Sequence, residues 1–261
     1  MIEAYAAGGA EHGAAGGGSL PNPMHQFEIK RLIPLELFGF DASFTNSALF
    51  MVIAGTIITL FTVYAMRNRA LVPSRVQSVA ELSYEFVANM VRDNAGTDGM
   101  KYFPFVFTLF MFVLVLNMLG MVPYSFTVTS HIVVTFAMAI FVMVGVTLIG
   151  FARHGLHFLS FFVPKGVPAA LLLLLVPIEI ISYLIRPFSL SIRLFANMLA
   201  GHTMLKVFGG FVVMMGLLGG WAPLAFIVVL TGLELLIAFL QAYVFAILTC
   251  LYLNDALHLS H

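Results

Sequence analysis

Residues 186–202 read RPFSLSIRLFANMLAGH and place charged and titratable side chains in a stretch that should lie in lipid. Arg193 matters most, because its guanidinium stays protonated at any relevant pH and can neither neutralise itself nor relay a proton. Holding such a charge near the middle of a bilayer costs about 2.5–3.5 kcal/mol on insertion scales. A membrane helix tolerates such a charge only when the charge faces a partner or a water-filled cavity. Arg193 is therefore a candidate functional residue.

Other polar residues of the same stretch are arranged by the helical repeat. At 3.6 residues per turn, Glu179, Arg186 and Arg193 step along one side of a helix. Asn197 follows Arg193 by one turn and extends this polar side. His202 lies about half a revolution away from Arg193, so it should face a different environment.

A second polar face is expected on the apolar helix that follows. Glu234 and Gln241 are seven residues apart and share one side of that helix. Glu234 and His202 can both bind and release protons, so polar stripes on two apolar helices predict a water-lined path. His202 alone is equally well explained as a packed histidine, and Glu234 favours the path. Three hydroxyl groups could extend this path, those of Ser182, Tyr183 and Ser189. Serine in membrane helices, however, more often forms a hydrogen bond with its own backbone.

The charges of this last apolar block do not balance. Its charged side chains are Glu179, Arg186, Arg193, Lys206 and Glu234. One cation is left without a carboxylate unless Arg186 or Lys206 reaches an interface. If the surplus is real, a neighbouring subunit should supply a carboxylate that faces Arg193. The alternative for a lone intramembrane arginine is a structural pairing with backbone carbonyls.

The composition indicates an all-α integral membrane protein. Hydrophobic residues make up 61% of the chain and charged residues 9%, against about 25% charged in an average soluble domain. Twelve basic and twelve acidic residues cancel, which argues against a basic surface for nucleic acid. The Gly/Ala-rich stretch 6–19 lacks the Gly-Lys-Ser/Thr of a phosphate loop, so we expect no nucleotide site. We also expect no metal and no cofactor.

Hydrophobic runs divide the chain into a flexible outside tail, 1–45, and one transmembrane domain, 46–261. A crossing needs about twenty residues, which predicts five membrane-crossing helices and one interfacial amphipathic helix. The expected elements are a first span 46–66, the interfacial helix 76–93, a hairpin 102–122 and 131–151, and long helices 169–216 and 221–255. The last two exceed one crossing and should tilt strongly, with a glycine-rich break between them. The interfacial pattern also fits a helix packed on a soluble partner.

The basic residues of the connections predict the orientation. They cluster between the first and second spans and after the third, whereas the connections 123–130 and 216–223 carry none. The basic connections should therefore be cytoplasmic, or on the matrix side of a mitochondrion. An outside N-terminus and an inside C-terminus then require an odd number of crossings, which agrees with five.

The run from Arg186 to His202 closely resembles the signature of subunit a of rotary F-type ATP synthases. Glu179 upstream, and Glu234 with Gln241 downstream, also match that family's polar positions at its spacings. The amphipathic connector and the five-crossing layout agree as well. The resemblance thus covers nearly the whole chain except the Gly/Ala-rich tail.

This resemblance implies a non-catalytic stator subunit that sits beside a ring of c subunits and contacts the b subunits of a peripheral stalk. Two offset proton half-channels would meet the ring, with Arg193 as the barrier between them and the partner of the ring carboxylate. The residues implied are Asn197, His202, Glu234 and Gln241 for the outer half-channel, Glu179, Ser182 and Tyr183 for the cytoplasmic one, and Arg186 and Ser189 in support. The pairing of His202 with Glu234 is similar to the mitochondrial and related bacterial arrangement. We expect a multi-pass protein of the bacterial inner membrane, with the mitochondrial inner membrane as the alternative.

Other classes of membrane protein fit the sequence less well. A secondary ion transporter, the main alternative, usually carries internal repeats, and no second copy of the 186–202 signature is visible. A structural scaffold would not need Arg193, Glu179 and Glu234 together. A redox subunit would want paired histidines at haem or quinone spacing. The resemblance further implies that the choice between protons and sodium ions is set largely in the ring.

Overall fold

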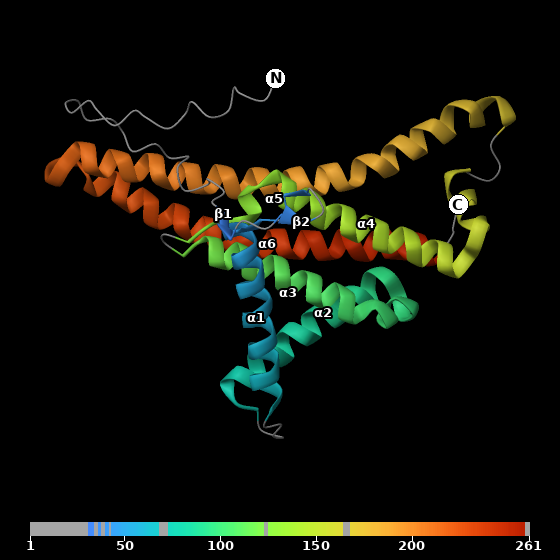
Figure 1. The fold of residues 1–261 in the computed structure, drawn as a ribbon, viewed down its shortest axis with the longest axis horizontal. Helices are drawn as coiled ribbons and strands as arrows, with labels where there is room; N and C mark the ends of the chain where they lie inside the picture. Colours follow the sequence, from blue (N-terminus) through green and yellow to red (C-terminus); the bar gives the residue numbers. More distant parts are fainter. Residues whose placement is uncertain are drawn as a thin grey trace.

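The computed structural model describes residues 31–33, 36–37, 40–41, 43–67, 73–122, 125–163 and 168–258. Long helices dominate these residues (Figure 1). They are α1 Asn46–Arg67, α2 Arg75–Gly99, α3 Phe103–Gly120, α4 Ile132–His154, α5 Ala169–Gly219 and α6 Trp221–Leu257, with short 3₁₀ helices η2 Met100–Tyr102, η3 Val128–Ser130 and η4 Gly155–Phe162. The expected all-α architecture is confirmed.

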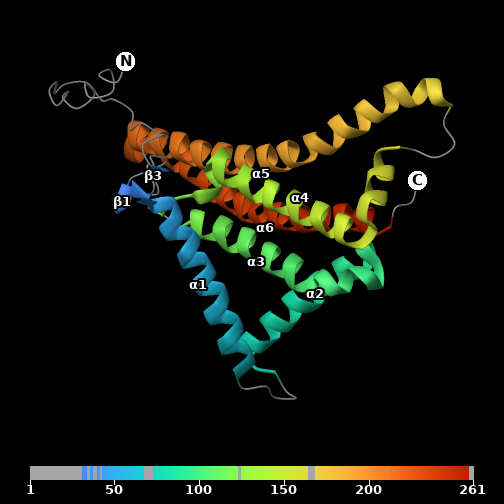
Figure 2. The same cartoon turned by 45° about the vertical axis from the view of Figure 1, so that its right-hand side comes forward.

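Within the described ranges, five helical segments are long and apolar enough to cross a membrane. They are Asn46–Arg67, Arg75–Gly120, Ile132–Phe162, Leu171–Gly216 and Trp221–Leu257. The second of these contains both α2 and α3. The chain reverses direction at η2, so the two helices form a V (Figure 2). Side chains on the outside of these helices are largely apolar, as expected for surfaces that face lipid or other membrane subunits.

The longest elements, α5 and α6, form an antiparallel hairpin along the long axis of the molecule (Figure 1). The turn between them lies at the glycine-rich break, where Gly216 has a positive φ of 61° that only glycine adopts without strain. Gly220 follows, and a Cβ there would lie 2.9 Å from the carbonyl oxygen of Val212. Glycine is therefore required for the chain to reverse so tightly.

The core surrounds α6, which contacts α2, α3, α4 and α5. Its buried face is built from small and large apolar side chains at helical spacing, among them Ala238, Ala242, Phe245 and Cys250. By contrast, the first part of α5 diverges from the other helices in both views (Figure 2). Of the two helices of the hairpin, α6 is therefore the one held by the other helices, and α5 packs against it.

The helix that the sequence predicts to lie in the interface is longer than expected. The sequence predicts 76–93, and α2 runs from Arg75 to Gly99, with the Ser74 hydroxyl accepting the backbone N–H of Gln77 at 3.3 Å. Only part of the expected apolar face is buried. Val87 and Met90 are in the core, whereas Leu82 is 65% exposed.

The residues just before α1 differ from the expected flexible tail 1–45. Arg31–Ile33 (β1) pairs antiparallel with Phe44–Thr45 (β4), and Glu36–Leu37 (β2) pairs with Phe40–Asp41 (β3). The expectation of a flexible tail rested on the Gly/Ala-rich stretch and did not include these strands. The later residues include isoleucine and phenylalanine, which favour strands. Residues 1–30 lie outside the described ranges.

Candidate functional site

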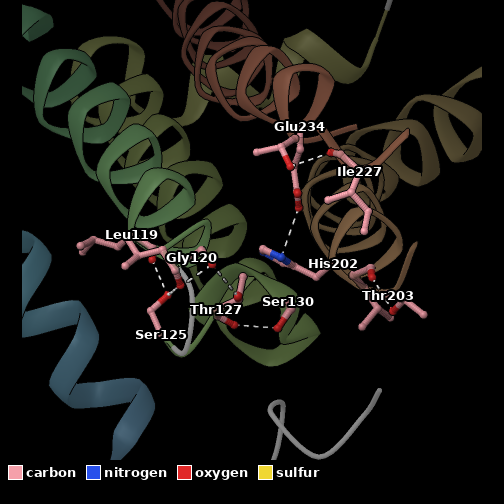
Figure 3. A network of polar contacts seen from close by, with 12 residues as sticks. Leu119, Gly120, Ser125, Thr127, Ser130, His202, Thr203, Ile227 and Glu234 are labelled. Carbon is pink, nitrogen blue, oxygen red and sulfur yellow. Dashed lines mark hydrogen bonds and ion pairs between the residues drawn. The ribbon is translucent and has the colours of Figure 1, made fainter. Parts of the chain in front are cut away.

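The centre of the site is a buried contact between α5 and α6. His202 Nδ1 lies 3.2 Å from Glu234 Oε1, and the two residues are only 6% and 4% exposed. Figure 3 shows the two side chains pointing toward each other across the helix interface. A titratable pair this deep is costly unless the partners share a proton or a charge. The two titratable side chains thus form a buried contact within hydrogen-bonding distance.

The approach of Glu234 to α5 depends on the residue before His202. A Cβ at Gly201 would lie 2.8 Å from Glu234 Oε1, closer than real Cβ contacts. The carboxylate therefore occupies the space that a side chain at this position would fill. The glycine of the sequence signature has a packing role that spacing alone did not reveal.

Two carboxamides accompany Glu234 along the inner face of α6. Gln241 is 9% exposed, and Asn117 of α3 is fully buried. Asn117 Nδ2 donates to the carbonyl oxygen of Ala238 at 3.2 Å, between Glu234 and Gln241 in the sequence. Sequence reasoning missed Asn117. Its signal was a single asparagine inside the otherwise apolar run 103–122.

A turn rich in hydroxyl groups approaches the His202 end of the pair. It joins α3 to α4 through η3, which contacts α5. Thr127 and Ser130 are buried there, and the Ser130 hydroxyl donates to the Thr127 carbonyl oxygen at 2.6 Å (Figure 3). Polar groups therefore continue from the buried pair into the turn between α3 and α4.

Arg193 lies on a different side of α5. Leu190 and Leu194 flank it and are buried in the core, whereas Arg193 itself is exposed. No described residue forms an ion pair with its guanidinium, although it lies within electrostatic range of Tyr252. Asn197, one turn further, is half-buried. The helix α5 thus carries a permanent cation on the side that no described part of the chain covers.

Nearer the start of α5, Arg186 is paired. Its Nη1 donates to Asp255 Oδ2 of α6 at 3.0 Å. Three aromatic rings surround the guanidinium, with centroids 5.1 Å away for Tyr252, 5.6 Å for Tyr183 and 6.0 Å for Phe161. The charge balance inferred from sequence needs correction here, because the carboxylate that neutralises Arg186 lies just beyond the last apolar block.

The remaining residues named from sequence lie on the same part of α5. Glu179 is half-buried, and Ser182 and Ser189 are exposed. The hydroxyl of Tyr183 is instead engaged with that of Thr147 on α4, at 2.6 Å. Two polar groups of residues are therefore brought together, one around His202 and Glu234 and one around Arg186, with Arg193 between them along α5.

Comparison with known proteins gives this arrangement its context. The family model described as ATP synthase A chain matches residues 48–254, which include every site residue named from sequence. The chain belongs to the ATP synthase subunit a family. It is therefore a subunit of the membrane sector of an F-type ATP synthase, and it takes part in ATP synthesis and proton transport.

Individual ATP synthase subunits a are similar over almost their whole length. The protein of Pelagibacter ubique is 62% identical over 241 residues, covering 92% of this chain and 99% of the relative. That of Mesorhizobium japonicum is 61% identical, with 92% and 98% covered. That of Parvibaculum lavamentivorans is 61% identical over 259 residues, with 97% and 99% covered.

Proposed function

We propose that this chain is the stator half of the proton path, forming two offset half-channels against a rotating ring whose subunits each carry a carboxylate. The observation that carries the proposal is the contrast between two arginines of α5. Arg186 is neutralised by Asp255, whereas Arg193 is exposed and has no ion-pair partner in the described parts of the chain. A permanent membrane cation of this kind needs a carboxylate from elsewhere.

The outer half-channel runs through the buried pair. His202 and Glu234 exchange protons with water that enters at the hydroxyl-rich turn, and Gln241 and Asn197 extend the polar lining. The 3.2 Å separation of His202 Nδ1 and Glu234 Oε1 supports this role, because one proton can pass between these atoms. The proton then neutralises the ring carboxylate.

Rotation follows from the cost of burying charge. A protonated carboxyl group enters lipid far more cheaply than its anion, so only the neutral ring site leaves the interface with this chain. After nearly a full turn, the proton leaves through the cytoplasmic half-channel near Glu179 and Ser182. The membrane potential contributes about 2.3 kcal/mol per charge per 100 mV to the direction of rotation.

Arg193 separates the two half-channels. Its guanidinium attracts the ionised ring carboxylate, and it cannot itself release a proton that would leak across. Nucleotide chemistry then belongs to other subunits of the complex, and the b subunits of the peripheral stalk hold this chain against rotation. The location we propose is the bacterial inner membrane.

The decisive test is Arg193→Ala in the complete ATP synthase, reconstituted into sealed vesicles. We expect assembly to persist, because removing a membrane charge lowers the insertion cost, while ATP synthesis driven by an imposed proton gradient is abolished. Arg193→Lys should also be severely impaired, since a desolvated lysine can lose its proton and lacks the planar fork. Synthesis and passive proton leak are measured on the same vesicles.

A matched control is Arg67→Ala, which removes an exposed arginine from the last turn of α1. Its synthesis rate should stay within about twofold of the parent. Normal coupled synthesis by assembled Arg193→Ala complexes would overturn the proposed function.

A further inference from the structure

The surroundings of Arg186 join four separate elements of the chain. The guanidinium comes from α5 and its carboxylate partner, Asp255, from the last turns of α6. Phe161 of η4 and Tyr252 of α6 place their rings beside the guanidinium. Tyr183 adds a third ring from α5, and its hydroxyl is hydrogen-bonded to α4. We call Arg186, Asp255, Phe161, Tyr183 and Tyr252 the arginine clamp.

The clamp restricts the orientation of the Arg186 guanidinium more than it contributes to the free energy of folding. The Arg186 side chain is 25% exposed and that of Asp255 is 41% exposed, so their Coulomb attraction is weakened by solvent. A planar guanidinium held between aromatic rings and a carboxylate nevertheless has few allowed orientations. The clamp therefore fixes how α5 is rotated against α6 at this level of the hairpin.

Arg193 is the nearest functional residue along α5. It lies seven residues after Arg186, which corresponds to two helical turns and an axial distance of about 10 Å. The intervening residues are helical, although Pro187 removes one backbone hydrogen bond at the start of the stretch, and Tyr252 lies within electrostatic range of both arginines. A rotation of α5 at the clamp would therefore also change the direction in which Arg193 points.

We propose that the arginine clamp is a positioning site, which sets the rotation and depth of α5 so that Arg193 is presented to its partner carboxylate. Asp255 is the key member, because it is the one carboxylate in the clamp and comes from the opposing helix. The inference rests on the proposed function for the role of Arg193, whereas the placement of α5 rests only on the contacts of the clamp.

The placement is measured directly, without reference to activity. Spin labels are attached to Ile192→Cys on α5 and Leu251→Cys on α6 in the assembled complex. The two native side chains are 49% and 40% exposed. The native thiol is removed by Cys250→Ala. We expect a narrow label-to-label distance distribution for the parent. Asp255→Asn should at least double its width, because Arg186 loses the partner that ties it to α6.

Coupled ATP synthesis is measured on the same substitutions without labels. Asp255→Asn should lower it at least fivefold. The exchanged pair Arg186→Asp with Asp255→Arg should restore a narrow distribution and at least half of the synthesis. The neutral pair Arg186→Gln with Asp255→Asn should restore neither, because it removes the surplus charge without rebuilding the contact.

The matched control is Asp98→Asn, which makes the same substitution in the ion pair that joins Arg153 of α4 to Asp98 of α2. It should change neither the distance distribution nor synthesis. An unchanged distribution for Asp255→Asn overturns the clamp whatever its synthesis rate, and so does full recovery by the neutral pair. If Asp255→Asn fails to assemble, the exchanged pair decides, and a broad distribution in it contradicts the proposal. Failure of the proposed function is recognised separately, by normal synthesis in Arg193→Ala.

Discussion

At the residue scale, the buried pair of His202 and Glu234 depends on a neighbour that has no side chain. Gly201 leaves room for the Glu234 carboxylate, whose Oε1 would lie 2.8 Å from a Cβ at this position. The carboxylate is held deep in the protein, so it has little freedom to move aside. A single added methyl group should thus displace one member of the pair from the other.

We predict that Gly201→Ala slows proton entry without preventing assembly. Overpacking of this kind typically costs about 1–3 kcal/mol, which corresponds to roughly 5- to 150-fold in the population of the working arrangement. Proton flux driven by ATP hydrolysis in sealed vesicles should fall about tenfold. Gly209→Ala is the control, because no atom lies within 4 Å of a Cβ on this glycine of the same helix. Equal flux in the two variants would contradict the packing role of Gly201.

The sequence predicted the candidate residues of α5 and α6 because charge in an apolar run is conspicuous. It did not predict Asp255 or Asn117 as partners. Asp255 follows the apolar block, and its pairing with Arg186 depends on the register of two antiparallel helices. Asn117 is contributed by α3, so its hydrogen bond to Ala238 requires knowledge of which helices are neighbours. Contacts between distant segments are tertiary information that a spacing rule within one helix does not contain.

At the element scale, the end of α4 shows how η4 is attached. Phe158 of η4 is 2% exposed and lies against Gly150 of α4, where an added Cβ would clash with the Phe158 ring. The ring also packs on Phe151 and Phe161, at centroid distances of 5.0 Å and 6.0 Å. Phe161 belongs to the arginine clamp, so this packing supports the clamp from behind.

We predict that Gly150→Ala destabilises the protein by about 1–3 kcal/mol, because the buried Phe158 ring has to move. Thermal unfolding in detergent can be followed through the thiol of Cys250, which is buried and becomes reactive to a maleimide dye on unfolding. The midpoint should fall by several degrees. Gly145→Ala on the same helix adds only an ordinary contact of 3.8 Å and should leave it unchanged. A shift of equal size in both variants would rule out the Phe158 contact as the cause.

Long apolar runs made the helices predictable, whereas their ends and partners were less so. The expected helix 131–151 and the observed α4, Ile132–His154, differ by up to three residues at an end. The short strands before α1 have too few residues for a periodic pattern. On α2, Leu82 shares the apolar spacing of Met90 but remains exposed, since burial depends on which helices cover that face.

At the scale of the whole molecule, the five apolar segments and the distribution of basic residues define an orientation that can be measured. Trp221 lies at the turn between α5 and α6 and is 70% exposed, and His258 follows the other end of α6. The positive-inside rule places the turn outside and His258 inside.

We therefore predict opposite labelling of single cysteines at these two positions in a Cys250→Ala background. A membrane-impermeant maleimide should modify Trp221→Cys from outside intact spheroplasts. It should modify His258→Cys only in inside-out vesicles. Labelling of both cysteines from one side would show that α6 does not cross the membrane as proposed, and a permeant maleimide serves as the control for reactivity.

The two contacts between α5 and α6 lie on either side of Arg193 along the helix. His202 meets Glu234 at one end, and Arg186 meets Asp255 at the other. One inserted or deleted residue between Arg186 and His202 would turn one contact about 100° relative to the other, so both could not form at once. The number of residues between Arg186 and His202 is consequently fixed by two contacts at once, in addition to the chemistry of the arginine that lies between them.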